Sequence, residues 1–205
     1  MKKTFLVVIS LAALVLMNTQ ASQEQLAKSI GEARAEAQKT SEQLKATLAS
    51  LNALTKQTKG DLKPAYETFT AEVANTQNAA QWTVARVQWM ATDGRQYFKT
   101  WQETIDGIAN PALKKKAQKR LDAVQASYTK VETSLKEAEA KFKPFLSDLS
   151  DIQKALAVDV TPGGVAAAKP VVKSANWNHQ YVNKAVDSAL KEMDKMEKSL
   201  SSQAK

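Results

Sequence analysis

The stretch that decides the fold is residues 117–156, AQKRLDAVQASYTKVETSLKEAEAKFKPFLSDLSDIQKAL. Its apolar residues recur at alternating spacings of three and four, which is the seam of a coiled-coil helix. The seam consists of Ala117, Leu121, Val124, Tyr128, Val131, Leu135, Ala138, Phe142, Phe145, Leu149, Ile152 and Leu156. A pattern this long and regular predicts one helix that packs along its length against other helices.

Two upstream stretches carry seams with the same spacing, over about residues 22–59 and from residue 62 onward. The first seam is Leu26, Ile30, Ala33, Ala37, Thr40, Leu44, Thr47, Leu51 and Leu54. The second is Leu62, Tyr66, Phe69, Val73, Thr76, Ala80, Thr83, Val87 and Met90, and its period continues past Gly94 to Ile108. These seams predict two more long helices.

Short connections separate the three predicted helices. Gly60 suits a helix C-cap and Asp61 an N-cap, while Asn110 before Pro111 is a capping residue followed by proline at the first helical position. Because such short connections force consecutive helices to run antiparallel, the sequence predicts an all-α fold: an elongated antiparallel coiled-coil bundle.

The C-terminal region has a different pattern. Thr161-Pro162-Gly163-Gly164 and Lys169-Pro170 are typical of turns, so we expect a loop over about residues 157–177. A shorter last helix then follows, at about residues 178–202. The three long helices and this shorter one would form a single domain, residues 22–205.

Residues 1–21 have the pattern of a secretory signal peptide. Lys2 and Lys3 precede the apolar run Phe5–Met17, and Thr19-Gln20-Ala21 places small residues where cleavage after Ala21 requires them. The run is shorter than the roughly 20 residues that cross a bilayer; the alternative is an uncleaved N-terminal anchor. With no later apolar segment of that length, we expect an exported protein, periplasmic where the cell has a periplasm, without a transmembrane segment after cleavage.

The residue inventory disfavours most enzyme classes. The 205 residues include no cysteine and one histidine, which excludes thiol chemistry and disfavours zinc sites and catalytic triads. We expect His179 to be exposed in the first turn of the last helix. Asp148 and Asp151 share a helix face, which we expect to be solvated. The sequence therefore predicts no enzyme, no cofactor and no metal site.

Two tryptophans lie one heptad apart on the second helix, outside its seam. Trp82 and Trp89 would give this helix a second apolar stripe, which favours packing against the last helix. The alternative is an exposed aromatic patch that contacts a glycan, a lipid or a protein partner.

The densest basic run is Lys114, Lys115, Lys116, Lys119 and Arg120, at the start of the third helix, in a chain of net charge +8. The helix dipole disfavours cations at that end. The run is therefore either a solvated face or a site for an anionic partner such as phosphorylated lipid, lipopolysaccharide or an acidic wall polymer. Nucleic acid is not expected, because aromatic residues do not alternate with these cations.

The second and third helices also carry a family resemblance. The residues concerned are Asp61-Leu62-x-x-Ala65-Tyr66-x-x-Phe69, Trp101-x-x-x-Ile105, Asn110, Leu113, Gln118-x-x-Leu121, Tyr128 and Ala138-Glu139-x-Lys141-Phe142-x-Pro144-Phe145-Leu146. Over most of the chain after the signal, the sequence resembles the domain-of-unknown-function family 2959, a family of exported bacterial coiled-coil proteins. The resemblance implies the fold and export, but no activity and no functional residues.

These observations favour a non-enzymatic structural or interaction protein of the bacterial cell envelope, with an envelope protein or an anionic envelope surface as partner. The alternative is a holdase-like periplasmic chaperone or a binder of anionic envelope surfaces. Self-association stays open, since a second copy could also fill the small-residue seams.

Overall fold

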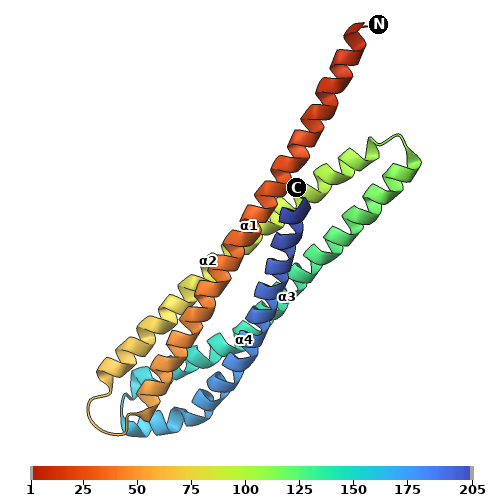
Figure 1. Ribbon diagram of the computed structural model, residues 1–205. Coiled ribbons are helices and arrows are strands. Elements are labelled where there is room, and N and C mark those ends of the chain that lie inside the picture. The colour runs from red at the N-terminus through yellow and green to blue at the C-terminus, as the bar shows by residue number, and fades with distance from the viewer. Residues whose placement is uncertain (1, 204–205) are drawn as a thin grey trace. The chain divides into compact units, whose positions relative to one another are not determined.

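The structure is a computed structural model that describes the backbone of residues 2–203 and the side chains of residues 19–201. It consists of α1 (Lys2–Lys56), α2 (Lys63–Asp106), α3 (Pro111–Val158) and α4 (Pro162–Gln203), with no strand between residues 2 and 203 (Figure 1). The predicted all-α bundle is confirmed.

The chain divides into two compact units, and each unit draws on all four helices. Unit 1 comprises Met1–Arg34, Ala85–Glu132 and Glu192–Lys205; unit 2 comprises Ala35–Val84 and Thr133–Lys191. The expectation of a single domain over residues 22–205 stays a prediction.

Helices α2 and α3 begin where the capping residues predict, but α1 ends at Lys56, so Gly60 lies in the connection and is not its C-cap. Gly60 adopts a φ of 84°, the left-handed conformation that glycine enters without steric strain, and Asp61 Oδ1 accepts a hydrogen bond from the Lys63 N–H at 2.9 Å. Asn110 Oδ1 accepts from the N–H groups of Ala112 and Leu113, at 3.0 and 3.2 Å. These bonds satisfy backbone donors that the first turn of a helix leaves free.

Unit 2 is an antiparallel four-helix arrangement in which each helix contacts two others. Its core consists of Leu44, Leu51, Leu54, Leu62, Phe69, Val73, Phe145, Leu149, Ile152, Leu156, Val165, Ala168, Val172, Ala175 and Val182. The polar contacts that join its helices run from α1 to α2 (Thr47–Thr76, 2.7 Å), α2 to α3 (Tyr66–Gln153, 3.0 Å), α3 to α4 (Asp148–Asn178, 2.7 Å) and α4 to α1 (Asn176–Asn52, 3.2 Å). These contacts connect the four helices in a ring. Helix α4 lies against α1 and α3, and α2 lies opposite α4 across the core.

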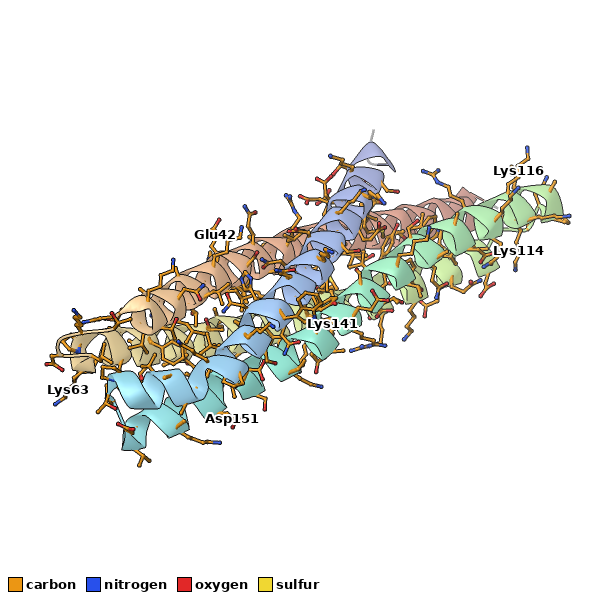
Figure 2. All side chains as sticks on the ribbon, turned by 90° about the horizontal axis from the view of Figure 1, so that it is seen from below. Glu42, Lys63, Lys114, Lys116, Lys141 and Asp151 are labelled. Atoms are coloured by element: carbon orange, nitrogen blue, oxygen red, sulfur yellow. The ribbon has the colours of Figure 1, made fainter. Side chains whose placement is uncertain are left out.

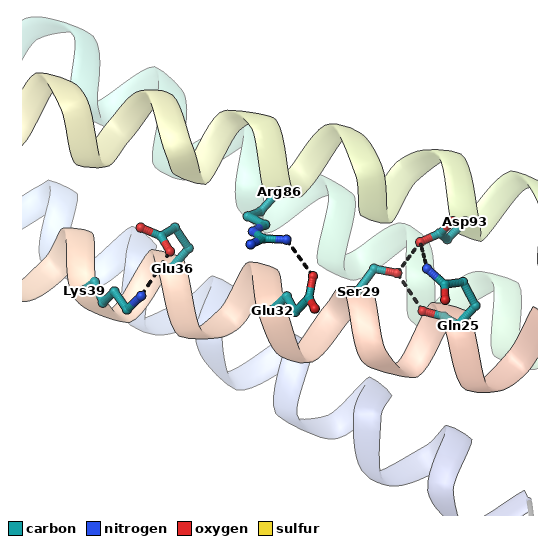
Figure 3. Close-up of polar contacts among 7 residues, drawn as sticks. All are labelled: Gln25, Ser29, Glu32, Glu36, Lys39, Arg86 and Asp93. Carbon is teal, nitrogen blue, oxygen red and sulfur yellow. Dashed lines mark hydrogen bonds and ion pairs between the residues drawn. The ribbon is translucent and has the colours of Figure 1, made fainter.

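Unit 1 joins α1 to α2 through charged and polar side chains beside its buried seams. Arg86 Nη1 lies 2.7 Å from Glu32 Oε2, and Asp93 Oδ2 accepts hydrogen bonds from Ser29 at 2.5 Å and Gln25 at 3.2 Å (Figure 3). These partners, like those in unit 2, run in opposite directions along α1 and α2, so the two helices are antiparallel as predicted.

The α2 helix continues through Gly94 because this glycine makes room for a tyrosine of α3. Tyr128 is buried, and its hydroxyl donates to the Met90 carbonyl at 3.0 Å. A Cβ at position 94 would lie 2.6 Å from Cζ and Oη of Tyr128. Glycine therefore lets the Tyr128 ring lie against the α2 backbone, which explains why a residue that disfavours helices stands inside one.

The C-terminal region differs from its prediction. Helix α4 begins at Pro162, so the expected loop over residues 157–177 and the short last helix are both wrong. Thr161 Oγ1 accepts from the Gly164 N–H at 3.2 Å, which makes Thr161 the N-cap and Pro162 the first helical residue. Gly164 lies so close to the Asp159 carbonyl that a Cβ there would overlap it. The Thr-Pro-Gly-Gly segment thus starts a helix after a very short connection.

The predicted signal peptide, residues 1–21, lies largely outside the described side chains, which begin at Thr19. Its export role and its cleavage after Ala21 stay predictions. Within the described part of the chain, no helical segment has the length and hydropathy needed to cross a membrane.

The contact between Gly94 and Tyr128 can be tested by Gly94→Ala. We expect this substitution to lower the free energy of unfolding by about 1–3 kcal/mol, because the added methyl group overpacks a buried ring. Urea unfolding followed by circular dichroism measures the change.

The matched control is Gly31→Ala, also inside a helix of unit 1. There the nearest atom to a new Cβ is Glu197 Oε1 at 3.5 Å, an ordinary contact, so this variant should gain roughly 0.5–1 kcal/mol from reduced backbone freedom in the unfolded chain. A Gly94→Ala protein as stable as the unsubstituted one would contradict the packing described.

Candidate functional site

The basic run occupies the first turns of α3, at the end of the α2/α3 hairpin of unit 1, where Lys114 and Lys116 project outward (Figure 2). Lys114 is held by α2: its Nζ lies 3.4 Å from Asp106 Oδ1 and donates to the Asp106 carbonyl at 3.2 Å. One of the five cations is therefore already paired within the protein.

The other four cations are exposed. Among the residues that the structure describes, no carboxylate lies within ion-pairing distance of Lys115, Lys116, Lys119 or Arg120. The helical period spreads these side chains over the solvent-facing side of α3. Their positive charges add to the positive end of the helix dipole, so this surface attracts anions and nothing within the described part neutralises it.

A large apolar side chain stands among these cations. Leu113 is 57% exposed in the first turn of α3, and the helical period places it on the same side as Lys116 and Arg120. We call Leu113, Lys115, Lys116, Lys119 and Arg120 the basic end of unit 1. The basic end is thus a cationic surface with one exposed leucine.

The charge of Arg120 acts on a buried tyrosine of α2. Burial raises the pKa of Tyr97 on α2 to about 12, and the positive charge of Arg120 partly opposes that rise. Tyr97 is therefore a neutral, buried phenol beneath the basic end, where it supports the hairpin and takes no part in acid–base chemistry near neutral pH.

The two tryptophans of α2 are exposed, so the prediction that they pack against the last helix is wrong. Trp82, in unit 2, is 60% exposed, and Trp89, in unit 1, is 52% exposed. In unit 2 the reason lies in the helix order: α4 packs on α1 and α3, which leaves no helix to cover the outer face of α2. Trp89 instead packs against Arg86, whose guanidinium carbon lies 4.8 Å from the ring centroid.

A second aromatic surface, on α4 of unit 2, went unrecognised in the sequence. Trp177 and Tyr181 are 60% and 41% exposed, with ring centroids 5.7 Å apart. Lys141 Nζ lies 5.8 Å from the centre of the Tyr181 ring. Trp177 and Tyr181 stand one turn apart and off the seam of α4, so the signal that could identify them is this helical spacing.

Asp148 and Asp151, which share a face of α3, have different partners. Asp148 Oδ2 accepts hydrogen bonds from Ser174 at 2.9 Å and Asn178 at 2.7 Å, whereas Asp151 is exposed and lies 3.9 Å from Lys154. No group of three metal-binding side chains occurs in the described part of the chain. The expectations of no catalytic residues and no metal stay predictions.

The comparison with protein families bears on nearly all of this structure. The family described as "Protein of unknown function (DUF2959)" matches residues 18–201, a span that contains both units' seams, the basic end and the exposed aromatic residues. The chain belongs to this family. The predicted family resemblance is confirmed, and the DUF2959 description assigns no activity to transfer. No match is found among curated proteins.

The single histidine of this DUF2959 protein is buried, so the prediction of an exposed His179 is wrong. Only 7% of its surface is exposed, its ring centroid lies 5.7 Å from that of Phe145, and Asn183 Nδ2 lies 3.3 Å from Nδ1. His179 occupies a seam position between Ala175 and Val182. Burial, and then the positive charge of Lys45, lower its pKa below the usual 6.5, so His179 is a neutral core residue.

This burial predicts a pH dependence of stability. Because the pKa of His179 is lower in the folded protein, the unfolded chain binds the proton more tightly. The contribution of the neutral His179 to the free energy of unfolding is fully present above about pH 6.5. It is lost as the pH falls through and below that value. We expect the free energy of unfolding to fall between roughly pH 7.5 and pH 5.5, as measured by urea titrations.

Two variants separate this effect from general destabilisation. His179→Leu should flatten the slope in that pH window, whereas Val182→Ala, at the next buried seam position, should lower stability and keep the slope. An unchanged slope in His179→Leu would show that His179 is not the group responsible.

Proposed function

We propose that this DUF2959 protein is a non-catalytic, exported interaction protein of the cell envelope whose basic end binds an anionic envelope surface. The observation that carries the proposal is the set of four exposed cations, Lys115, Lys116, Lys119 and Arg120, without a carboxylate partner in the described part of the chain. Their place at the N-terminal end of α3 adds the dipole to their charge.

This arrangement of charges does not stabilise the folded protein. Like charges gathered at the positive end of a helix repel one another and the dipole, each by a few tenths of a kcal/mol. An anionic surface attracts each of these cations and offsets their mutual repulsion. Basic residues near such a surface contribute about 1 kcal/mol each, so four together suffice for reversible binding.

Export and the lack of catalysis rest on the sequence. Lys2, Lys3 and the apolar run Phe5–Met17 support export to the envelope. The absence of cysteine and the single histidine, which is buried in the seam, support a non-enzymatic role. The export signal thus supports a location in the envelope, and the residue inventory supports a binding role for the cationic surface.

The holdase-like alternative would draw on the exposed Trp82, Trp89 and Trp177. Suppression of the aggregation of an unfolded outer-membrane protein, lost when these residues are replaced by serine and kept when the basic end is neutralised, would favour it over the anionic surface.

The proposal predicts that neutralising the basic end abolishes binding to anionic surfaces. The variant with Lys115, Lys116, Lys119 and Arg120 replaced by glutamine should bind vesicles containing phosphatidylglycerol on the order of 1,000-fold more weakly at low salt, since each cation is worth about 1 kcal/mol. Co-sedimentation measures the binding, which should also weaken as salt approaches physiological ionic strength.

The matched control replaces four exposed lysines of α4 in unit 2, Lys169, Lys173, Lys184 and Lys191, by glutamine. This control has the same net charge as the test variant and should keep most of the binding. Equal losses of vesicle binding in the two variants would show that net charge alone determines the binding. No loss of binding in the first variant would refute the proposed function.

A further inference from the structure

The exposed leucine at the basic end distinguishes among anionic partners. A polyphosphate, an acidic wall polymer and a lipid headgroup all offer negative charge to lysine and arginine. Only a bilayer also offers hydrocarbon just below that charge. Leu113 is 57% exposed at the end of the hairpin, and its neighbours Pro111 and Ala112 are exposed as well.

The arrangement of side chains matches the layers of a membrane surface. Leu113 precedes the cations along α3 and so lies nearest the connection between α2 and α3, whereas Lys116 and Arg120 follow it by about one and two turns on the same side. Lysine and arginine carry long apolar stems with charged ends that remain in water or among phosphates. The leucine can therefore enter the hydrocarbon boundary while the cations stay at the headgroups.

The chain also enters unit 1 at this end. Thr19 of α1 lies 3.0 Å, hydroxyl to hydroxyl, from Thr104, which stands two residues before the end of α2. The apolar sequence Phe5–Met17 directly precedes Thr19, so it joins the unit beside the α2–α3 connection. A segment of this composition enters the membrane during export. Where it stays as an uncleaved anchor, it holds this end at the bilayer, whereas cleavage after Ala21 removes it together with Thr19.

We propose that Leu113 inserts at the hydrocarbon boundary of an anionic lipid bilayer while Lys115, Lys116, Lys119 and Arg120 contact the lipid phosphates. This inference rests on the proposed function and names the lipid bilayer as the anionic surface. Burial of one leucine side chain adds a salt-insensitive contribution to the electrostatic one, so the bilayer binds more tightly than a soluble polyanion of similar charge.

The test compares two ligands with one substitution. Leu113→Ser should weaken co-sedimentation with phosphatidylglycerol vesicles about 10-fold or more, and it should leave the affinity for soluble inorganic polyphosphate unchanged. Because Leu113 is exposed, the variant should keep the circular dichroism and the unfolding transition of the unsubstituted protein.

The matched control is Val158→Ser. Val158 is 90% exposed, at the C-terminal end of α3 in unit 2, away from the basic run in sequence. This control should change neither affinity. A general effect of removing an exposed apolar side chain would appear in both variants and would overturn the assignment to Leu113.

The outcomes separate this inference from the proposed function. If Leu113→Ser keeps its vesicle affinity while the neutralised basic end loses it, the insertion is refuted and the proposed electrostatic binding to an anionic surface stands. If Leu113→Ser weakens binding to vesicles and polyphosphate equally, the leucine does not recognise hydrocarbon and the inference fails. If neutralising the basic end changes nothing, the proposed function fails first.

Discussion

A pair of buried threonine hydroxyls sets the register on which the packing of unit 2 depends. Thr47 Oγ1 lies 2.7 Å from Thr76 Oγ1 and 2.9 Å from the Glu72 carbonyl. Each hydroxyl carries one hydrogen, and either threonine can be the donor in the contact between them. Both side chains are fully buried. Sliding α1 against α2 by one heptad would leave at most one of the two threonine pairs, Thr47–Thr76 and Thr40–Thr83, at a cost of about 0.5–1.5 kcal/mol for the lost hydrogen bond.

Once that register is set, the seams bury the apolar side chains of unit 2 in one core. Leucines at the seam positions of α1 pack with those of α2 and α3, and α4 closes the cycle in unit 2. The hollow between α3 and α4 is small, about 230 Å³, and is lined mainly by alanine and aliphatic side chains, with Asp151 and Asp159 at its edge. On the outer surface of the described residues, the basic end and the exposed tryptophans are the most prominent features.

The sequence was sufficient where one regular pattern decided the structure. Every predicted seam residue of α1 from Leu26 to Leu54 is buried, because a long 3/4 repeat places all its apolar side chains on one face of the helix. The basic run is likewise where the Asn110-Pro111 cap predicts it, at the start of α3. Membership of the DUF2959 family followed from the motifs of α2 and α3.

The sequence was insufficient where a local signal has two meanings. Thr161-Pro162 can end a helical region or begin one, and only the Thr161 hydroxyl on the Gly164 N–H decides for a beginning. A loop over residues 157–177 leaves no seam through Val165, Val172 and His179. For this reason the sequence predicts an exposed His179, whereas the structure buries it. The exposure of Trp82 depended on which helix stands opposite α2, a property of helix order that no periodicity within one helix contains.

Hydrogen exchange of the full chain with and without phosphatidylglycerol vesicles tests the central claim, that the basic end meets a lipid surface, most directly. Backbone amides that a bilayer covers exchange more slowly. Slower exchange confined to about residues 107–120 is the result expected here. Protection centred on Trp82, Trp177 or another part of the described chain, or no protection at low salt, would contradict it.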